Sequence, residues 1–432
     1  MKFDVQHSTI MMSPVLPFDI ISLIIDIVGE NRDTNLLKEL TLVSHSFHQI
    51  CGKHLFAIVE LHDALPEYHV ASSKKGFVKL LKNRPDVVKY IRKLTYKVSS
   101  NNRIQSCSPG PTYPSFDNDD HLLSPVLPNF LRTISRLNCL TINASKLDWN
   151  TLDSSLTSAF LHLMDLPTIN HIDLSLIQNF PLSSLTPSVN LHRLDIFYLR
   201  LEEDDSFEII IQSEMVPKIR ELHTSESSLL TTKLLHAKGQ DGRPAFNFID
   251  LKRLSISSTC FEDEWNIRYL LQNAKLLEKL HLSVGLGWSL VGLHDILSPN
   301  ASTLKVLDLT VSLYDDLPLA GLCDELEAMA GHNVLESLSF EVQVDGDETV
   351  DSIGSIIQKV EKVLIKPGWS ALRQVFFKLS IACCQVSKED SAELSEALQS
   401  LPNKYLSHLS KLESVAFNFS AYVVKCAFDI EL

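Results

Sequence analysis

One short pattern of apolar residues recurs eleven times after residue 90. A copy has an apolar residue, two others, an apolar residue, one other and usually a third apolar residue, as in Leu251-Lys-Arg-Leu254-Ser-Ile256. A unit with a single apolar stripe cannot bury that stripe alone, and stacking on the next copy covers it. The pattern therefore predicts a solenoid over most of the chain, and an elongated solenoid favours binding over catalysis. The copies begin at Ile91, Leu137, Ile169, Leu191, Ile219, Leu251, Leu277, Leu304, Leu335, Leu372 and Leu412.

The segments between the copies have the spacing of helices. From Leu137 onwards, successive copies begin between 22 residues apart (Ile169 to Leu191) and 40 residues apart (Leu372 to Leu412). One strand and one helix per step resembles the leucine-rich-repeat arrangement. That resemblance implies an α/β solenoid with a parallel sheet on its concave face and helices on its convex face. Helix-like stretches cover residues 265–277, 319–330, 350–364 and 388–401.

Residues 14–62 predict a small domain of three helices. Pro17 suits the first helical position, because its missing N–H would be unpaired there anyway, and Gly29 is a natural end for this helix. A second helix is expected from about Thr34 and a third over residues 44–54. A domain of this size has little core of its own and commonly depends on a partner or on an adjoining domain. Apolar residues at helical spacing in the first helix are Ile20, Ile21, Ile24, Ile25 and Val28.

The remaining chain divides by composition. Residues 1–13 are expected to be a flexible tail, and residues 63–98 a connecting helix followed by the first repeat strand. Residues 99–128 are rich in Ser, Asn, Pro and Asp, which predicts either a functional loop or a disordered insertion. Residues 129–432 are expected to hold the irregular repeats.

Charge and hydropathy argue against two classes of partner. The chain carries 39 Lys and Arg against 53 Asp and Glu, a net charge of −14. Nucleic-acid binding and attraction to anionic membranes both need clustered cations, so neither is expected. The apolar run from Ile20 to Val28 is interrupted by Ser22 and Asp26 and is too short to span a bilayer.

The eight cysteines are scattered through the chain. None forms a C-x-x-C pair, and the adjacent Cys383 and Cys384 suit neither an ordinary disulfide nor a zinc knuckle. We therefore interpret them as small buried hydrophobic residues in a reducing compartment.

The first 62 residues resemble the F-box family. Leu16-Pro17 opens an apolar helix, and Leu40-Thr-Leu42-Val43-Ser44 followed by Phe47 and His54-Leu55-Phe56 completes the ordered pattern. The version here is most similar to the F-box-like proteins that are abundant in fungi. In those proteins the segment after the F-box is similar to Phe77-x-x-Leu80-Leu81 and its surroundings here. Many F-boxes carry Trp where this chain has Phe47, so the indole N–H is missing.

The resemblance implies a role in a cullin-RING (SCF-type) ubiquitin ligase, in the cytoplasm or the nucleus. The F-box docks on a Skp-type adaptor, and through it on a cullin, while the repeats bind a protein substrate. The alternative is a non-catalytic repeat scaffold that does not bind the adaptor. Adaptor contacts are expected at Leu16, Pro17, Ile20, Ile24, Leu40, Val43, Ser44 and Phe47, although several of these also pack the three helices together.

Strand geometry predicts the substrate surface. Side chains alternate across a strand, so the residues between the repeated apolar ones point to the concave side. Each of them taken singly is interpreted first as an ordinary solvated residue, because few residues dominate even a real interface. The candidates are Asp173, Asp195, Phe197, His223, Arg253, Lys279, His281, Asp308 and Phe376.

No catalytic constellation is visible, and neither a cofactor nor a metal is expected. No nucleophile, base and oxyanion site come together in the sequence. His45, His48, Cys51 and His54 recur at three-residue spacing, so a pair could face one metal ion. A run of four at that spacing drifts around the helix, however, and the family resemblance accounts for the segment without a metal.

Overall fold

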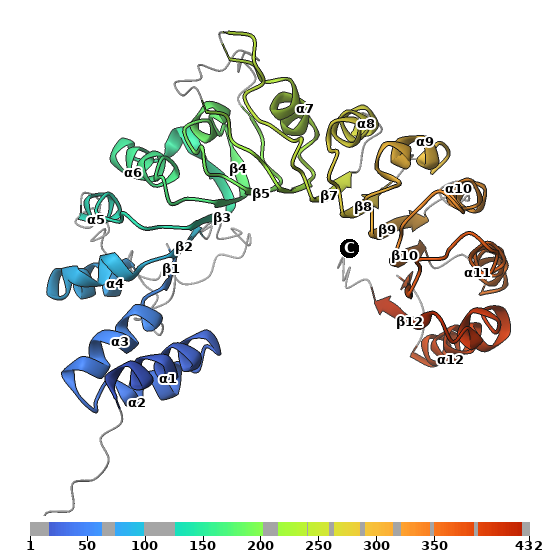
Figure 1. The fold of residues 1–432 in the computed structure, drawn as a ribbon, viewed down its shortest axis with the longest axis horizontal. Helices are drawn as coiled ribbons and strands as arrows, with labels where there is room; N and C mark the ends of the chain where they lie inside the picture. Colours follow the sequence, from blue (N-terminus) through green and yellow to red (C-terminus); the bar gives the residue numbers. More distant parts are fainter. Residues whose placement is uncertain are drawn as a thin grey trace, which may run out of the picture.

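The protein is an arc of repeats with a small helical head at its N-terminal end (Figure 1). The structure, a computed structural model, describes residues 17–62, 74–98, 126–201, 215–239, 241–258, 263–285, 290–313, 321–345, 350–383 and 388–425. The predicted tail of residues 1–13 and most of the predicted insertion of residues 99–128 lie outside these ranges.

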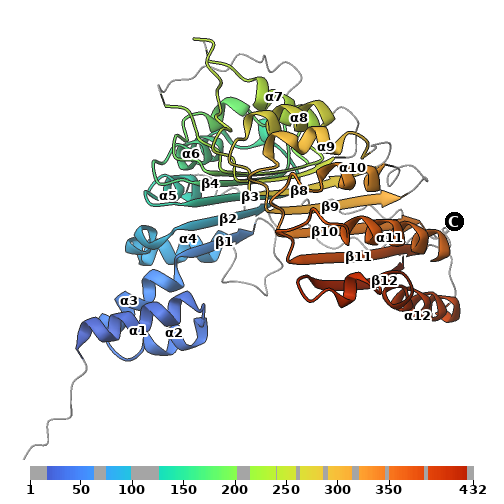
Figure 2. The ribbon, with the colours of Figure 1, turned by 45° about the vertical axis from the view of Figure 1, so that its right-hand side comes forward.

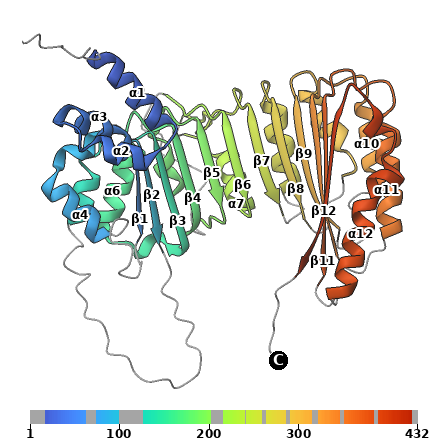
Figure 3. The same cartoon turned by 90° about the horizontal axis from the view of Figure 1, so that it is seen from below.

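One parallel sheet runs through the whole arc. Its twelve described strands follow one another in chain order from β1 to β12 (Figure 3). They line the concave side, which confirms the predicted α/β solenoid. The strands are β1 (Ile58–His62), β2 (Lys93–Val98), β3 (Cys139–Asp148), β4 (His171–Gln178), β5 (Arg193–Phe197), β6 (Glu221–Ser225), β7 (Arg253–Ser258), β8 (Lys279–Val284), β9 (Val306–Leu313), β10 (Ser337–Asp345), β11 (Gln374–Cys383) and β12 (Ala416–Lys425).

Helices cover the convex side of the sheet (Figure 1). Because a parallel connection must return the chain to the starting edge, each step carries a crossover segment, most often a helix. These helices are α4 (Lys74–Asn83), α5 (Val126–Leu131), α6 (Ser154–Met164), α7 (Ser228–His236), α8 (Asp263–Asn273), α9 (Leu293–Leu297), α10 (Leu322–Met329), α11 (Val350–Leu364) and α12 (Lys388–Tyr405). Short 3-10 helices are η2 (Pro85–Tyr90), η4 (Trp149–Thr151), η5 (Leu182–Leu185), η6 (Ser298–Asn300) and η7 (Leu409–Lys411).

The repeated apolar residues form one continuous core between strands and helices. In β7, Leu254 and Ile256 are buried, while the side chain of Arg253 on the opposite face is 60% exposed. The strand register places equivalent residues side by side. Leu254 pairs with Leu222 of β6 and with Leu280 of β8. Stacking of equivalent apolar residues is therefore what makes each repeat depend on the next.

Two carboxylates, one buried and one partly buried, link neighbouring repeats through hydrogen bonds. Glu361 of α11 is 4% exposed and accepts hydrogen bonds from the backbone N–H groups of His408 (2.8 Å) and Leu409 (3.0 Å). Glu325 of α10 likewise accepts from Gly292 and His294, each at 2.7 Å, at the start of α9. Each carboxylate satisfies backbone donors that a short helical turn leaves unpaired.

The head consists of α1 (Phe18–Glu30), α2 (Thr34–Leu40) and α3 (His45–Leu55), which lie beyond β1, apart from the convex helices (Figure 2). Asp33 and Ser44 cap α2 and α3 by accepting hydrogen bonds from the N–H groups of Leu36 and Phe47. Each cap satisfies one of the N–H donors that the start of its helix leaves without a partner. The fully buried core of the head, among the described residues, is Ile25, Leu37 and Cys51.

Two details of the first predicted helix are wrong. Pro17 precedes α1 rather than opening it, and the helix continues past Gly29 to Glu30. Gly29 serves a different purpose, because a Cβ atom there would overlap the His54 ring. The glycine thus allows α1 and α3 to approach closely. The chain reverses just afterwards, where Arg32 has a φ of 57°.

The sheet begins one strand earlier than predicted. The first repeat strand was expected in the segment of residues 63–98, but β1 lies within residues 14–62. Phe56-Ala-Ile-Val59-Glu-Leu61 is a further copy of the apolar pattern, and Val59 and Leu61 pair with Leu94 and Tyr96 of β2. This copy was not predicted, because the residues around it were assigned to the basic and apolar end of the F-box-like segment.

Two other boundaries also move. Pro128, expected in the insertion, lies in α5, where its missing N–H falls in the first turn. The last copy of the pattern is shifted by two residues, because Gln374 pairs with Ala416 and Phe376 with Asn418. An alternating sequence permits such a slip without exchanging faces, since the side-chain period is two.

Candidate partner-binding surfaces

The head carries a broad apolar surface that the rest of the described chain leaves uncovered. Helix α1 has two apolar stripes, each at helical spacing. One stripe, with Ile21, Ile25 and Val28, packs into the head core. The other faces solvent, where Leu23 is 60% exposed, and Leu42 after α2 is 87% exposed. We call this the head surface; its residues are Phe18, Ile20, Leu23, Ile24, Ile27, Leu36, Leu42 and Val43.

The predicted adaptor residues divide between the head surface and the head interior. Pro17, Ile20, Ile24 and Val43 are exposed, whereas Leu40 and Phe47 are partly buried and pack against the head core. Ser44 is the N-cap of α3, and Leu16 lies outside the described residues. Ile20, Ile24 and Val43 belong to the head surface, and Pro17 is the exposed residue that precedes α1.

Sequence reasoning missed Phe18, Leu23, Ile27 and Leu42 as surface residues. The sequence did contain a sign of these residues. One apolar stripe is enough for the core, and this helix has more apolar residues than one stripe holds: Phe18-Asp-Ile-Ile-Ser-Leu-Ile-Ile-Asp-Ile-Val28. Ile20, Leu23, Ile24 and Ile27 lie at i, i+3, i+4 and i+7, which places them on one side. A second stripe of this kind is typical of a partner interface.

A polar hollow adjoins the head surface where α3 meets η2. It is lined in part by Leu42, Ser44, His48, Arg84 and Lys89. Arg84 donates a hydrogen bond of 2.8 Å to Nε2 of His48 and also pairs with Asp86. The head surface therefore has an apolar centre with a polar border, the usual anatomy of a protein interface.

The four residues weighed as metal ligands do not converge. His45 contacts Gln49 at 3.1 Å, His48 contacts Arg84, and His54 contacts Asp26 at 2.7 Å. Cys51 is buried in the head core. Each of them makes a contact within the protein.

The concave surface is built as predicted, by residues that alternate with the apolar core. Strand register aligns Asp173, Asp195 and His223 across β4, β5 and β6. It aligns His281 and Asp308 farther along, and Arg253 with Lys279 one row away. Phe197 lies on β5 beyond Asp195, and Phe376 lies on β11, far along the arc. Equal register on neighbouring strands is what brings the first of these groups together.

An ion-pair network centred on Asp195 crosses the concave surface. Asp195 accepts a hydrogen bond of 2.8 Å from Nε2 of His171 and bonds of 3.0 and 3.1 Å from Nε of Arg193. Glu221 joins Arg193 at 3.5 Å and Arg253 at 3.3 Å. Asp195 is only 4% exposed, so its expected role as a direct substrate contact is better described as support for Arg193 and His171.

Burial and neighbouring charges set the protonation of this network. Burial alone would lower the pKa of His171, but its hydrogen bonds with Asp195 and Cys139 outweigh burial and raise the pKa to about 9. Burial would likewise raise the pKa of Asp195, and the hydrogen bonds from His171 and Arg193 lower it instead. Nε2 of His223 lies 3.9 Å from Oδ1 of Asp195, too far for a hydrogen bond, and burial lowers the pKa of His223. Burial and the charge of Asp195 raise the pKa of Asp173.

Other predicted residues form separate groups. Lys279 pairs with Asp308 at 3.1 Å, while burial lowers the pKa of His281 beside them. Phe376 is 38% exposed at the far end of the arc. Lys378, on the same strand, pairs with Glu341 at 2.6 Å, and its Nζ lies 5.4 Å from the centroid of the Tyr422 ring, within the range of a cation–π contact.

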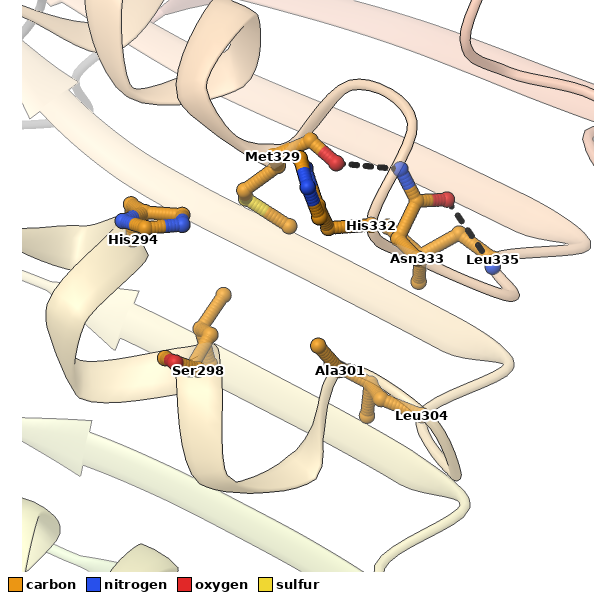
Figure 4. Close-up of a pocket in the computed structure, with 9 residues that line it drawn as sticks. His294, Ser298, Ala301, Leu304, Met329, His332, Asn333 and Leu335 are labelled. Carbon is orange, nitrogen blue, oxygen red and sulfur yellow. Dashed lines mark hydrogen bonds between the residues drawn. The ribbon is translucent and has the colours of Figure 1, made fainter.

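A small cavity lies between the loops that precede β9 and β10 (Figure 4). Asn333 closes one side by donating to the Met329 carbonyl (2.7 Å) and accepting from the Leu335 N–H (3.2 Å). The cavity volume of about 20 Å³ holds roughly one water molecule. His294 and His332 border it, but so little space gives no room for a substrate.

Comparisons with known proteins give no family for this chain. No family model matches it, and no curated protein matches it. A solved structure of a Bacteroides fragilis protein aligns over 83% of this chain and 73% of its own, with 11% sequence identity and a TM-score of 0.27. A similarity this weak carries no argument. Among the residues that the structure describes, no helix has the length and apolar character needed to cross a membrane.

Proposed function

We propose that the chain is the substrate-recognition subunit of a cullin-RING (SCF-type) ubiquitin ligase. The observation that carries the proposal is the head surface, which includes the second apolar stripe of α1, on a three-helix unit whose sequence resembles an F-box. Large apolar side chains that face water are unfavourable by roughly 25 cal/mol for each Å². A partner that covers the stripe removes that penalty, and a Skp-type adaptor is the partner that the resemblance implies.

The energetics of the head support dependence on a partner. A core whose fully buried apolar residues, among those described, are Ile25, Leu37 and Cys51 gives an isolated unit little stability. The close approach at Gly29 and the pairs of Asp26 with Lys53 and His54, both at 2.7 Å, hold α1 against α3. The exposed stripe of α1 is thus presented on a fixed frame rather than on a free helix.

The concave surface is the proposed substrate side. Parallel strands present rows of side chains with fixed spacing, and variation in those residues gives one scaffold many specificities. The mixed charges around Asp195 and the exposed ring of Phe376 fit a protein ligand better than nucleic acid, given the net charge of −14. The cullin would be reached through the adaptor, in the cytoplasm or the nucleus, with no membrane contact.

Co-purification with a Skp-type adaptor tests the proposal. We expect the full chain to bind the adaptor, and the double variant Leu23→Asp with Ile27→Asp to lose at least about 100-fold in affinity, since buried interface residues each contribute on the order of 2 kcal/mol. The matched control changes another exposed pair at i and i+4, Trp265→Asp with Tyr269→Asp on α8, which should leave adaptor binding unchanged.

Failure of the unmodified chain to bind any Skp-type adaptor would overturn the proposal. The chain would then be a repeat scaffold without ligase function. Equal loss in both double variants would show that the head surface is not the docking site.

A further inference from the structure

Three chemically reactive side chains meet on the concave surface, one from each of three adjacent strands. Sγ of Cys139 on β3 lies 3.2 Å from Nδ1 of His171 on β4. Nε2 of the same ring lies 2.8 Å from Oδ2 of Asp195 on β5. A thiol, an imidazole and an orienting carboxylate in this order form the arrangement that activates a cysteine nucleophile. Cys139 is buried, as predicted for the cysteines, but its contact with a histidine gives it a chemistry that a hydrophobic residue lacks.

The surroundings favour a positively charged His171. Asp195 is nearly fully buried and holds its negative charge against both His171 and Arg193. With a pKa of about 9, the His171 ring carries a proton on both nitrogens at neutral pH, so Nδ1–H donates to Sγ and Nε2–H donates to Asp195. Lys93 of β2 is the register partner of Cys139 on its other side. Asp173 and His223 are the remaining titratable neighbours on the facing strands.

We propose that Cys139, held against His171, reacts with hydroperoxides and makes the concave surface sensitive to oxidation. The Sγ–H proton passes to water as Sγ attacks one peroxide oxygen, an S–O bond forms and the O–O bond breaks. The leaving hydroxide takes the Nδ1 proton of His171 and departs as water. Sulfur is oxidised by two electrons, peroxide is reduced by two, and the product is a sulfenic acid beside a neutral imidazole.

The small exposed area of Cys139 limits which oxidants can reach its sulfur. Cys139 is 9% exposed, so a bulky electrophile is excluded while hydrogen peroxide, little larger than water, reaches the sulfur. The oxygen added to Sγ must occupy the space across which Sγ and Nδ1 now make contact at 3.2 Å. Oxidation therefore displaces His171 and weakens its bond with Asp195, which supports Arg193 on the same surface.

The test is oxidation of the folded full chain by limiting hydrogen peroxide, which is then quenched, and denaturation in the presence of a 1,3-dione, so that the trap reaches every sulfenic acid. Peptide mass spectrometry assigns each cysteine. Cys323 is the matched thiol, because it is more exposed than Cys139 while burial raises its pKa. We expect Cys139 to be trapped at least about tenfold faster than Cys323. Equal rates, or faster trapping at Cys323, would overturn the proposal.

Two further measurements separate activation from accessibility. His171→Gln should slow the trapping of Cys139 by about tenfold or more, and His281→Gln, a concave histidine on β8, should leave the rate unchanged. If His171→Gln fails to fold, the ratio of Cys139 to Cys323 trapping in the unmodified chain decides the proposal, and a ratio of about one or below overturns it.

Discussion

The head and the solenoid differ in where their large apolar side chains lie: the stacked residues of the solenoid are buried, whereas many in the head face solvent. In the solenoid, residues such as Leu254, Leu280 and Leu307 stack in register between neighbouring strands and are buried. In the head, Ile25 is buried in α1, but Leu23 and Ile27 of the same helix face solvent at 60% and 51% exposure. The solenoid completes its own core by repetition, whereas the head leaves an apolar stripe for a partner.

The largest expected effect contrasts one leucine from each region. Leu280→Ala on β8 removes a side chain that is 0% exposed and should lower the free energy of unfolding by about 2–5 kcal/mol, because it leaves a cavity between stacked repeats. Leu23→Ala in the head should change it by no more than about 0.5 kcal/mol. Urea unfolding followed by circular dichroism measures both. Similar losses of unfolding free energy in the two variants would contradict the distinction between buried apolar residues of the solenoid and exposed ones of the head.

The second prediction concerns pH and the solenoid's concave network. Because the folded pKa of His171, about 9, exceeds the usual 6.5, its protonated form stabilises the fold fully below about pH 6.5. That contribution, on the order of a few kcal/mol, is lost as pH rises towards 9. His223 should behave oppositely and oppose folding on acidification, since burial lowers its pKa. NMR titration of the two rings checks the order, and a His171 midpoint below that of His223 would contradict it.

A smaller effect is expected where a carboxylate joins two repeats. Glu361→Ala leaves the N–H groups of His408 and Leu409 without their acceptor and should lower the free energy of unfolding by about 1–3 kcal/mol. Glu327→Ala, which removes an exposed pair with Lys366, is the matched control and should cost less than about 0.5 kcal/mol. Thermal unfolding compares them. Equal shifts would show that Glu361 does not join the repeats.

The smallest effect is expected in the head. Asp26 pairs with Lys53 and His54, and its side chain is 35% exposed, so Asp26→Asn should lower the free energy of unfolding by at most about 1 kcal/mol. The hydrogen bond from Lys53 lowers the pKa of Asp26, and the contribution is therefore present above about pH 4 and lost on further acidification. Urea unfolding of the unmodified chain and of Asp26→Asn at pH 7 and at pH 3 measures this contribution. A larger difference in unfolding free energy between the two proteins at pH 3 than at pH 7 would contradict the prediction.

Much of the fold could be predicted because its determinants are local. Strands β2 to β11 lie at the predicted copies of the apolar pattern, and Asp33 and Ser44 mark the starts of α2 and α3. The prediction missed β1, because its residues were assigned to the F-box-like segment. It misplaced the last copy by two residues at β12, because an alternating sequence keeps the same face after such a slip.

The candidate surfaces could be predicted only in part. Alternation alone assigned Arg253, Lys279 and Phe376 to the concave side, because a strand exposes every second residue. It gave no sign that Asp195 would be buried among partners or that Leu23 would be exposed, since both depend on neighbouring elements.

The sequence by itself determined that this chain is a stack of strand and helix units behind a helical head, because periods of two and of 3.6 residues are properties of the local backbone. Only the tertiary structure decided which residues meet. Cys139, His171 and Asp195 lie on three strands, each separated by more than twenty residues of chain, and come together through register. Register is set by the packing of the whole core, so no single segment of sequence contains it.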